Sequence, residues 1–313
     1  MISFALRRVL STVPVMLFVA FFVFSLLYLA PGDPAALIAG DQASAAEIAR
    51  IRENLGLDEP MLVRFLEWIT HVLRGDLGVS IFSRLPVSTL IAQRLEPTLS
   101  LMGLTLVISV AVAVPLGVLA AARQGTWVDR LVMAIAVFGF SVPVFVIGYL
   151  LSYVFAIRLD LLPVQGYSPL AGGFLPFLRN LVLPAAALSC VYIALIARIT
   201  RTSMIDVLSQ DYIRTARAKG LGPTPVLFLH ALKNASVPVV TVIGIGIAML
   251  IGGAVVTETV FAIPGVGRLV VDAILRRDYP VIQGVVLLFS MGYVLINLGI
   301  DLLYTLLDPR VRY

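Results

Sequence analysis

The sequence has 313 residues, of which 60% are hydrophobic and only 13% are charged, with a formal net charge of +5 and a mean hydropathy of +1.01. A soluble domain cannot bury so large an apolar fraction, so the composition excludes an ordinary soluble globular protein and indicates a membrane protein. The single cysteine, Cys190, excludes an internal disulfide and a thiolate metal site. His71 and His230 lie far apart in sequence, which argues against a histidine cluster for metal binding or catalysis.

Six stretches of about 20 uncharged, mostly apolar residues have the length that a membrane-spanning helix requires. They predict an all-α polytopic membrane protein with six transmembrane helices, at residues 9–30, 98–122, 131–157, 180–197, 234–257 and 279–300. The first stretch is longer than a signal-peptide core, and Pro31 follows where a small-residue cleavage site would stand, so we expect it to remain as a helix. Each of the first five stretches holds one proline, and a hinge role for any of them stays open because membrane helices tolerate proline. These prolines are Pro14, Pro115, Pro143, Pro184 and Pro238.

The distribution of basic residues predicts the orientation. If the N-terminus lies inside, twelve basic residues fall on the cytoplasmic side and five fall in the two short outer loops. The long first loop does not enter this comparison, since long segments translocate whatever their charge. Both termini are therefore predicted to be cytoplasmic. The twelve inner residues are Arg7, Arg8, Arg123, Arg130, Arg198, Arg201, Arg214, Arg217, Lys219, Lys233, Arg310 and Arg312.

The long loop after the first stretch holds nine acidic residues against six arginines, and we expect it to be a structured extracytoplasmic segment. Ser44 with Glu47 three residues later has the form of a capping box that opens a helix, which Gly56 would close. Pro60 would open a second helix and Gly75 would end it. The predicted apolar face of this second helix consists of Leu62, Phe65, Ile69 and Val72. The loop is either a cap over the membrane domain or a docking floor for an extracellular partner.

The loop between the fifth and sixth stretches, residues 257–284, holds Pro264, Gly265 and Gly267 close to membrane depth. Proline lacks a backbone N–H and glycine adopts conformations closed to other residues, so these three residues are expected to break the helix. Non-helical backbone at that depth is tolerated only inside protein or beside a water-filled cavity, which favours a re-entrant turn. An ordinary outer loop with a flexible tip is the alternative, and the sequence does not separate the two.

The cytoplasmic loop of residues 198–233 contains a predicted amphipathic helix. Residues 203–219 have helical periodicity, Gly220 is placed to stop the helix, and Pro223 is placed to start the next one, which leads into the fifth stretch. The apolar stripe consists of Ile205, Leu208, Tyr212 and Ala216. Such a basic helix can be a solvated face, a topology signal or a contact for acidic lipid head groups. Nucleic-acid binding is excluded, because no aromatic interleaving or recognition fold accompanies the charges.

This loop, with "DYIRTARAKGL" followed by "HALKNA", resembles the cytoplasmic signature loop of ABC-importer permeases of the dipeptide/oligopeptide branch, which also handles nickel and glutathione. The resemblance covers the whole chain through "LRRVL", "APGDPA", "LGLDEP", "GDLGVSIFSRLPV", "ETVFAIPGVGRL", "RRDYPVIQG" and "DLLYTLLDPRVRY", in family order. In the wider superfamily the signature runs Glu-Ala-Ala, three residues, then Gly. Aligned on Gly220, Arg214 replaces the Glu and Thr215 the first Ala, so the family's glutamate contact does not carry over.

The resemblance implies the type I ABC importer permease fold and a coupling helix that sits in a groove on a separate ATPase subunit. The residues that match the coupling helix are Asp211, Tyr212, Arg214, Thr215, Ala216, Arg217, Ala218, Lys219 and Gly220. The resemblance further implies that an outer turn dips toward the translocation path and helps to empty the binding protein. The residues that match this turn are Glu258, Phe261, Pro264, Gly265, Gly267 and Arg268.

Family architecture also implies the partners: a second, homologous permease subunit forming a heterodimer, two ATP-binding subunits, an extracytoplasmic solute-binding protein and membrane lipids, with no nucleic acid. No phosphate-binding motif of the G-x-x-x-x-G-K-[ST] type occurs in the sequence. We therefore expect a non-catalytic chain that binds no cofactor or metal, with ATP and Mg on the partner ATPase subunits. The expected location is the bacterial cytoplasmic (inner) membrane.

The predicted function is that of a permease subunit of an ATP-driven importer for short peptides or related small solutes. Residues 1–94 would form the first helix and the extracytoplasmic region, residues 95–305 the transmembrane domain with its coupling loop, and residues 306–313 a cytoplasmic tail. An ion-coupled secondary transporter is the alternative, but such carriers usually bury functional Asp, Glu or His within their spans, and these stretches have none. A membrane hydrolase is a weaker alternative, because no set of nucleophile, base and metal is visible. The sequence does not identify the solute.

Overall fold

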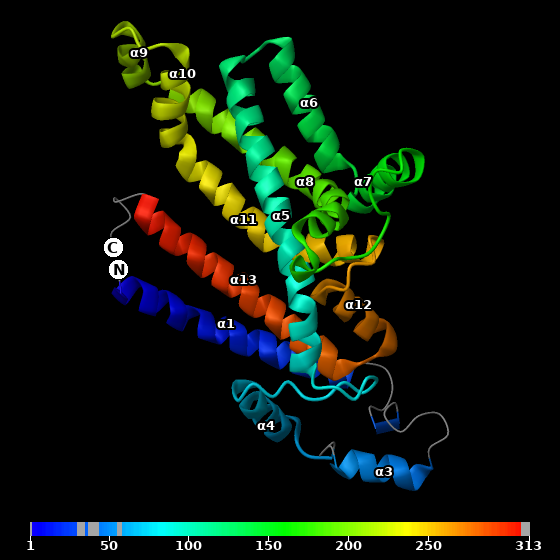
Figure 1. Ribbon diagram of the computed structural model, residues 1–313. Helices are drawn as coiled ribbons and strands as arrows, with labels where there is room; N and C mark the ends of the chain where they lie inside the picture. Colours follow the sequence, from blue (N-terminus) through cyan, green and yellow to red (C-terminus); the bar gives the residue numbers. More distant parts are fainter. Residues whose placement is uncertain (1, 30–34, 37–43, 55–57, 308–313) are drawn as a thin grey trace. The chain divides into compact units, whose positions relative to one another are not determined.

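The computed structural model of the protein describes residues 2–29, 35–36, 44–54 and 58–307, and its regular structure there is helical (Figure 1). Within these ranges no strand occurs, apart from one isolated bridge between Val79 and Pro86. This confirms the predicted all-α class. The elements are α1 (Ile2–Leu29), α3 (Ala45–Asn54), α4 (Met61–Leu73), α5 (Val87–Ala122), α6 (Trp127–Ser141), α7 (Val144–Leu151), η1 (Ser152–Arg158), η2 (Leu170–Gly172), α8 (Phe174–Leu208), α9 (Asp211–Ala218), α10 (Pro223–Pro225), η3 (Val226–Ala231), α11 (Leu232–Val260), α12 (Val266–Arg276) and α13 (Tyr279–Leu307).

The chain divides into two compact units. Unit 1 comprises Met1–Arg94 and Leu269–Val294, and unit 2 comprises Leu95–Arg268 and Leu295–Tyr313. Helices α5, α12 and α13 each contribute residues to both units. All the predicted functional residues belong to unit 2.

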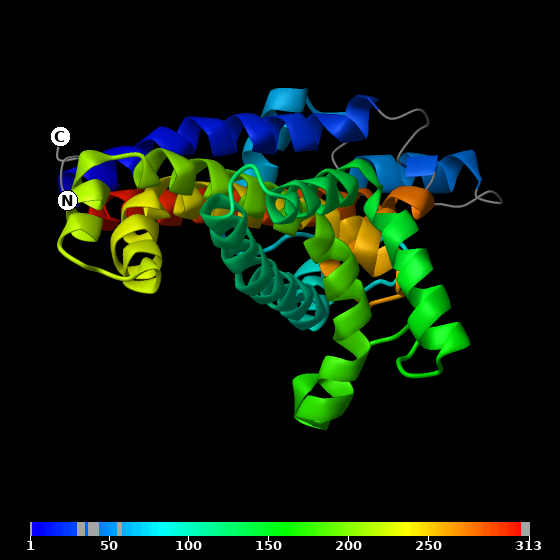
Figure 2. The ribbon, with the colours of Figure 1, turned by 90° about the horizontal axis from the view of Figure 1, so that it is seen from above.

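Unit 1 is held together by an aromatic cluster between α1 and α4. The Phe65 ring meets Phe21 and Phe24 edge to face, with ring centroids 5.3 and 5.5 Å apart. Trp68 lies against Phe24 at 5.5 Å, and Leu287 of α13 belongs to the same cluster. Both views accordingly show α1 beside the unit 1 part of α13 (Figures 1 and 2).

The helices of the first loop begin and end at their predicted signals. The Ser44 N–H donates to Glu47 Oε2 at 2.8 Å and the Glu47 N–H donates to Ser44 Oγ at 3.3 Å, which is the reciprocal capping box of α3. The Ser44 hydroxyl also donates to Glu47 Oε2, at 2.9 Å, and the bonds from the Ser44 N–H and hydroxyl hold the pKa of the Glu47 carboxyl below its usual value. Pro60 is the N-cap of α4, and Gly75 follows its end at φ +84°. Gly56 lies outside the described residues.

The apolar face of α4 differs from the prediction at one position. Phe65 is buried and Ile69 and Val72 are half-buried, as predicted, but Leu62 is 64% exposed. The reason is that Phe65 and Trp68 both pack against α1, which centres the buried face on these two aromatic residues and turns Leu62 away from it.

Four helices are long and apolar enough to cross a membrane, namely Val87–Ala122, Phe174–Leu208, Pro223–Val260 and Tyr279–Asp301. The pair α6 and α7–η1 makes a fifth span if its two bent parts are counted together. The first predicted stretch lies in α1, which is helical from Ile2 to Leu29. The apolar segment described within α1, Leu10–Ser25, is shorter than a full span. The total of six spans stays a prediction.

The third predicted stretch, residues 131–157, is not one continuous helix. α6 ends at Ser141, α7 begins at Val144, and the two parts are bent by 104°. Val142 is extended at φ −89° and ψ 127°, the conformation that a residue before proline prefers. Pro143 cannot donate to the preceding turn, so the helix restarts after it. The prediction of a continuous span is therefore wrong here.

Helix α8 is the central element of unit 2 and packs against α6, α7 and α11. The apolar core of unit 2 includes the buried residues Leu181, Leu188, Ile196, Leu250 and Phe261. Small residues allow the helices to approach closely. A Cβ added to Gly139 of α6 would lie 3.1 Å from the carbonyl oxygen of Cys190 on α8, and one added to Gly253 of α11 would lie 2.8 Å from Leu188 Cδ1.

Candidate functional site

Helix α9 is a separate eight-residue helix with a sharp stop at each end. Gln210 precedes it in an extended conformation, and Asp211 places a negative charge in its first turn, which the helix dipole favours. At the other end, Gly220 lies at φ +84°, its N–H donates to the Arg217 carbonyl at 2.9 Å, and the Leu221 N–H donates to the Ala216 carbonyl at 3.3 Å. These two bonds make a Schellman cap. The predicted role of Gly220 as the helix stop is confirmed.

Ile213 anchors α9 to the rest of unit 2. Its side chain is fully buried, in a cluster formed by the ends of α5, α8, η3 and α11. The other members of this cluster are Val118, Ala121, Met204, Val226, Ala231 and Ala235. Ile213 is not among the residues predicted for the apolar stripe, because the periodicity of residues 203–219 predicts one continuous helix. The chain leaves α8 after Leu208 and starts again at Asp211, so the two parts do not share one helical register.

The remaining α9 residues form an exposed polar surface. Tyr212, which the single-helix prediction placed on the buried stripe, is 44% exposed, and Ala216 is half-buried. The exposed residues are Asp211, Tyr212, Arg214, Thr215, Arg217, Ala218, Lys219 and Gly220. Arg214 and Asp211 form an ion pair at 3.2 Å that is open to solvent and contributes little to stability. The surface therefore has the character of a contact face rather than a reaction centre.

The second group of predicted residues forms what we call the Glu258 turn, residues 258–268. Helix α11 ends at Val260, the chain turns at Phe261, and α12 begins at Val266. The Ile263 N–H donates back to the Glu258 carbonyl at 2.9 Å, which closes the turn. Ala262 takes the left-handed conformation at φ +52°.

The Glu258 carboxylate lies at the centre of this turn and is fully buried. It accepts a hydrogen bond from the Thr98 hydroxyl at 2.6 Å and another from the Arg268 N–H at 2.9 Å. The Thr98 oxygen in turn accepts from the Val266 N–H at 2.8 Å. Two N–H groups in the first turn of α12 are thereby satisfied by side chains from α11 and α5. A carboxylate at a helix N-terminus is also favoured by the helix dipole.

Gly265 and Gly267 are required for a different reason from the one predicted. Neither appears among the glycines with positive φ, so a conformation reserved for glycine is not what they supply. A Cβ on Gly265 would overlap the Glu258 carboxylate, and one on Gly267 would lie 2.6 Å from Val255 Cα. The prediction of glycine-only turns is wrong, because space for the carboxylate is what excludes larger residues.

The side chains of the Glu258 turn are packed inside unit 2. Phe261 and Ile263 are 3% and 0% exposed, whereas Pro264 is exposed and Arg268 half-buried. A Cβ added to Gly148 of α7 would lie 3.1 Å from the Phe261 ring. The Gly166 N–H donates to the Phe261 carbonyl at 3.0 Å. The turn is therefore enclosed by α7 and by the loop that follows η1.

The structure does not bring the two groups of residues together. α9 and the Glu258 turn lie at opposite ends of α11, as Figure 1 shows. The helix has 29 residues, which corresponds to about 44 Å at the usual rise per residue. In the described ranges no group of three or more His, Cys, Asp or Glu residues is placed to hold a metal ion. The molecule thus has two separate candidate sites joined by one helix.

Comparison with known proteins gives a consistent result over the whole length. A family model described as a binding-protein-dependent transport system inner membrane component matches residues 113–313. A second model, for the N-terminal part of binding-protein-dependent transport system membrane components, matches residues 1–102.

Relatives with assigned names are similar over their full length. The chain is 58% identical to a probable peptide ABC transporter permease protein of Sinorhizobium fredii, y4tP, over 99% of each chain. It is 46% identical to the glutathione transport system permease protein GsiC of Salmonella typhimurium and 47% identical to a putative peptide transport system permease protein of Brucella abortus, over 100% of each chain. Among solved structures, it resembles a chain of the inward-facing MetNI methionine ABC transporter with a TM-score of 0.59 and 18% identity, over 70% of this chain and 97% of that one. At this identity the likeness concerns the fold alone.

Proposed function

This chain belongs to the family of binding-protein-dependent transport system inner membrane components, and on that premise we propose that it is the permease subunit of an ABC importer. Its cargo is short peptides or related small solutes such as glutathione, and its membrane is the bacterial cytoplasmic membrane. The names of the Sinorhizobium, Brucella and Salmonella relatives support this cargo class.

The observation that carries the proposal is α9. An eight-residue helix that stands between two long apolar helices, held by one buried residue and otherwise exposed, is suited to contact a separate protein. In the proposed importer this protein is an ATPase subunit, and α9 is the coupling helix. ATP and Mg then belong to the ATPase subunits, and the permease contributes no catalytic residue.

The full assembly in this proposal comprises the chain, a second homologous permease, two ATPase subunits and an extracytoplasmic binding protein. The chain adopts the type I importer permease fold with six spans and both termini in the cytoplasm, which places α9 inside and α3 and α4 outside. The excess of basic residues in the predicted inner segments supports this orientation.

The Glu258 turn lies on the outer side in this arrangement, where it is the re-entrant turn that meets the solute on its way from the binding protein. Its burial in unit 2 and its closure by Glu258 and Thr98 support a shaped element rather than a mobile loop.

The fully buried Glu258 is also the feature that could favour an ion-coupled carrier, because such carriers depend on ionisable residues within the membrane. Both of its carboxylate oxygens, however, accept hydrogen bonds that cap α12 and fix Thr98. A carboxylate whose two oxygens already accept hydrogen bonds within the protein is suited to stabilising the turn rather than to binding and releasing an ion in each transport cycle. We therefore retain the ATP-driven importer.

The test reconstitutes the complete importer in proteoliposomes and follows ATP-dependent uptake of labelled dialanine and glutathione. Reversing the charge of the α9 surface with Arg214→Glu and Arg217→Glu leaves the Ile213 anchor intact. We expect the amount of ATPase that co-purifies, and the uptake rate, to fall about tenfold or more, because reversing the sign of charges that a partner surface complements replaces attraction by repulsion.

The matched control is Arg50→Glu, on the exposed surface of α3, which should assemble and transport normally. The proposal fails if the α9 variant binds its ATPase and transports as the control does. It also fails if the unaltered importer takes up neither peptide when ATP is supplied.

A further inference from the structure

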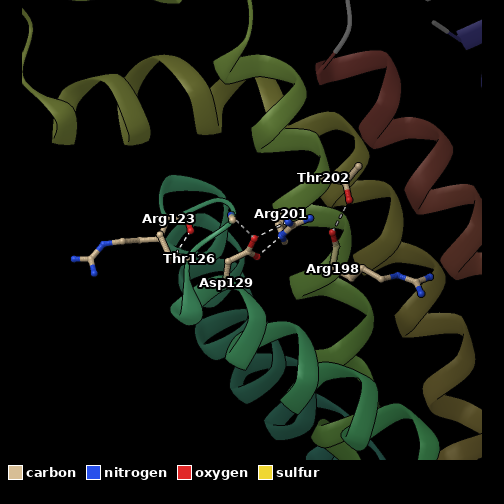
Figure 3. Close-up of polar contacts among 7 residues, drawn as sticks. Arg123, Thr126, Asp129, Arg198, Arg201 and Thr202 are labelled. Carbon is tan, nitrogen blue, oxygen red and sulfur yellow. Dashed lines mark hydrogen bonds and ion pairs between the residues drawn. The ribbon is translucent and has the colours of Figure 1, made fainter.

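One ion pair in unit 2 belongs to neither of the two sites described above. The Arg201 guanidinium donates from Nε to Asp129 Oδ1 at 2.5 Å and from Nη2 to Asp129 Oδ2 at 2.7 Å, so the contact is bidentate (Figure 3). The Gly125 N–H donates to the same Oδ2 at 3.0 Å. The Asp129 side chain is only 5% exposed and that of Arg201 24% exposed, so protein encloses the pair.

This pair joins three elements. Asp129 lies in the first turn of α6, Gly125 lies in the turn between α5 and α6, and Arg201 lies on α8, 72 residues further along the chain. Other basic residues are close by, among them Arg123 and Arg198, whose side chains point away from the carboxylate (Figure 3). Charge counting alone therefore does not distinguish Arg201 from its neighbours.

On one side the pair is linked to α9. Met204 follows Arg201 by one turn of α8 and is fully buried in the same cluster as Ile213. A displacement of α9 therefore acts on the end of α8 that carries Arg201.

On the other side the pair is linked to the Glu258 turn. From Asp129, α6 runs along α8, with Gly139 against the Cys190 carbonyl, as far as the break at Pro143. After the break, Gly148 of α7 lies against the Phe261 ring. Unit 2 thus contains a continuous series of contacts from α9 through α8, the ion pair, α6 and α7 to the Glu258 turn.

We propose that Asp129 and Arg201 are a positioning pair that makes α6 and α7 follow the movement of α9 during transport. This inference rests on the proposed function, because it takes α9 as the point at which the ATPase acts. A bidentate guanidinium–carboxylate contact has a narrow geometry, and separating its charges inside the protein is costly. With the pair intact, α6 moves with α8 as one body. Without it, α8 shifts past α6, and ATP is hydrolysed without a matching movement at the Glu258 turn.

The test measures ATP hydrolysed per dialanine or glutathione molecule imported by the reconstituted complete importer. The variants are Asp129→Asn, Arg201→Gln and their combination, and the matched control is Arg198→Gln, which removes an exposed arginine one turn earlier on the same helix. We expect each single variant to raise the ratio by about threefold to tenfold, which lies within the range of effects produced by residues along a coupling network. Because the pair acts as a unit, the double variant should match the single variants rather than multiply their effects. The control should keep the unaltered ratio.

A residue that merely stabilises the fold would lower the amount of assembled importer and leave this ratio unchanged, so the ratio separates positioning from stability. If either neutral variant fails to assemble, Arg201→Lys carries the test, since it keeps the charge and loses the bidentate geometry. An assembled Asp129→Asn, Arg201→Gln or Arg201→Lys importer with the normal ratio overturns the proposal, and so does a double variant whose effect is the product of the singles. Failure of the proposed function is distinct, because then the unaltered importer shows no ATP-dependent uptake at all.

Discussion

The Gly265→Ala substitution tests whether the Glu258 carboxylate determines the shape of the outer turn. The added Cβ would overlap the carboxylate, which has no free space because it is fully buried. The carboxylate must then leave the Thr98 hydroxyl and the Arg268 N–H, to which it bonds at 2.6 and 2.9 Å. Hydrogen bonds to a charged group are each worth about 1.5–3 kcal/mol, so we expect the free energy of unfolding to fall by about 3–6 kcal/mol.

The assay is denaturant unfolding of the purified chain in detergent, with Gly252→Ala as the matched control. Gly252 lies in the same α11 helix and has no atom within 4 Å of an added Cβ, so this substitution should be neutral or stabilising by up to about 1 kcal/mol. The combination of Gly265→Ala with Glu258→Ala should be no less stable than Glu258→Ala alone, because the overlap then disappears. Equal stability of the two glycine variants, or costs at positions 258 and 265 that simply add, would refute this reasoning.

Two further predictions concern the anchor of α9 and the burial of the outer turn. Ile213→Ala should lower the local stability of α9 by about 2–5 kcal/mol, measured by hydrogen exchange of the α9 amides. Tyr212→Ala should leave that exchange nearly unchanged, and equal effects of the two substitutions would contradict the assignment of Ile213 as the anchor. In a Cys190→Ala background, buried Phe261→Cys should react slowly with a membrane-impermeant reagent in the resting importer, and exposed Pro264→Cys should react faster. The labelling rate at position 261 should change when the binding protein docks and nucleotide is trapped. Fast labelling at position 261 that is the same in every state would mean that the turn is a mobile loop without a role in transfer.

The features that the sequence predicts correctly depend on residues close together in the chain. The Ser44–Glu47 capping box is formed within one helical turn, and the stops at Gly75 and Gly220 follow from glycine's access to positive φ. Four of the six apolar stretches likewise coincide with helices long enough to span a membrane, because membrane-spanning length is a property of one segment. These signals require no knowledge of what the segment packs against.

The features that the sequence misses depend on contacts between distant residues. Thr98 and Glu258 are 160 residues apart, and Asp129 and Arg201 are 72 residues apart, so no local pattern joins either pair. The same limit explains the interpretation of Gly265. A glycine can serve for its backbone freedom or for the space that its missing side chain leaves, and only the position of the Glu258 carboxylate decides between them.

The break between α6 and α7 combines a local cause with a distant one. Pro14, Pro184 and Pro238 lie inside continuous helices, so proline alone does not end a helix in this protein. At Pro143, which has no N–H to donate, the Val142 N–H bond to the Phe138 carbonyl closes the last turn of α6, and α7 turns away to place Gly148 against Phe261. A continuous helix would carry α7 along the axis of α6. With α6 held against α8 by the Asp129–Arg201 pair, Gly148 of α7 could then not lie against Phe261. The bend therefore lets one span contact both the α9 end and the Glu258 end of unit 2, which is the arrangement that transmission between the two sites requires.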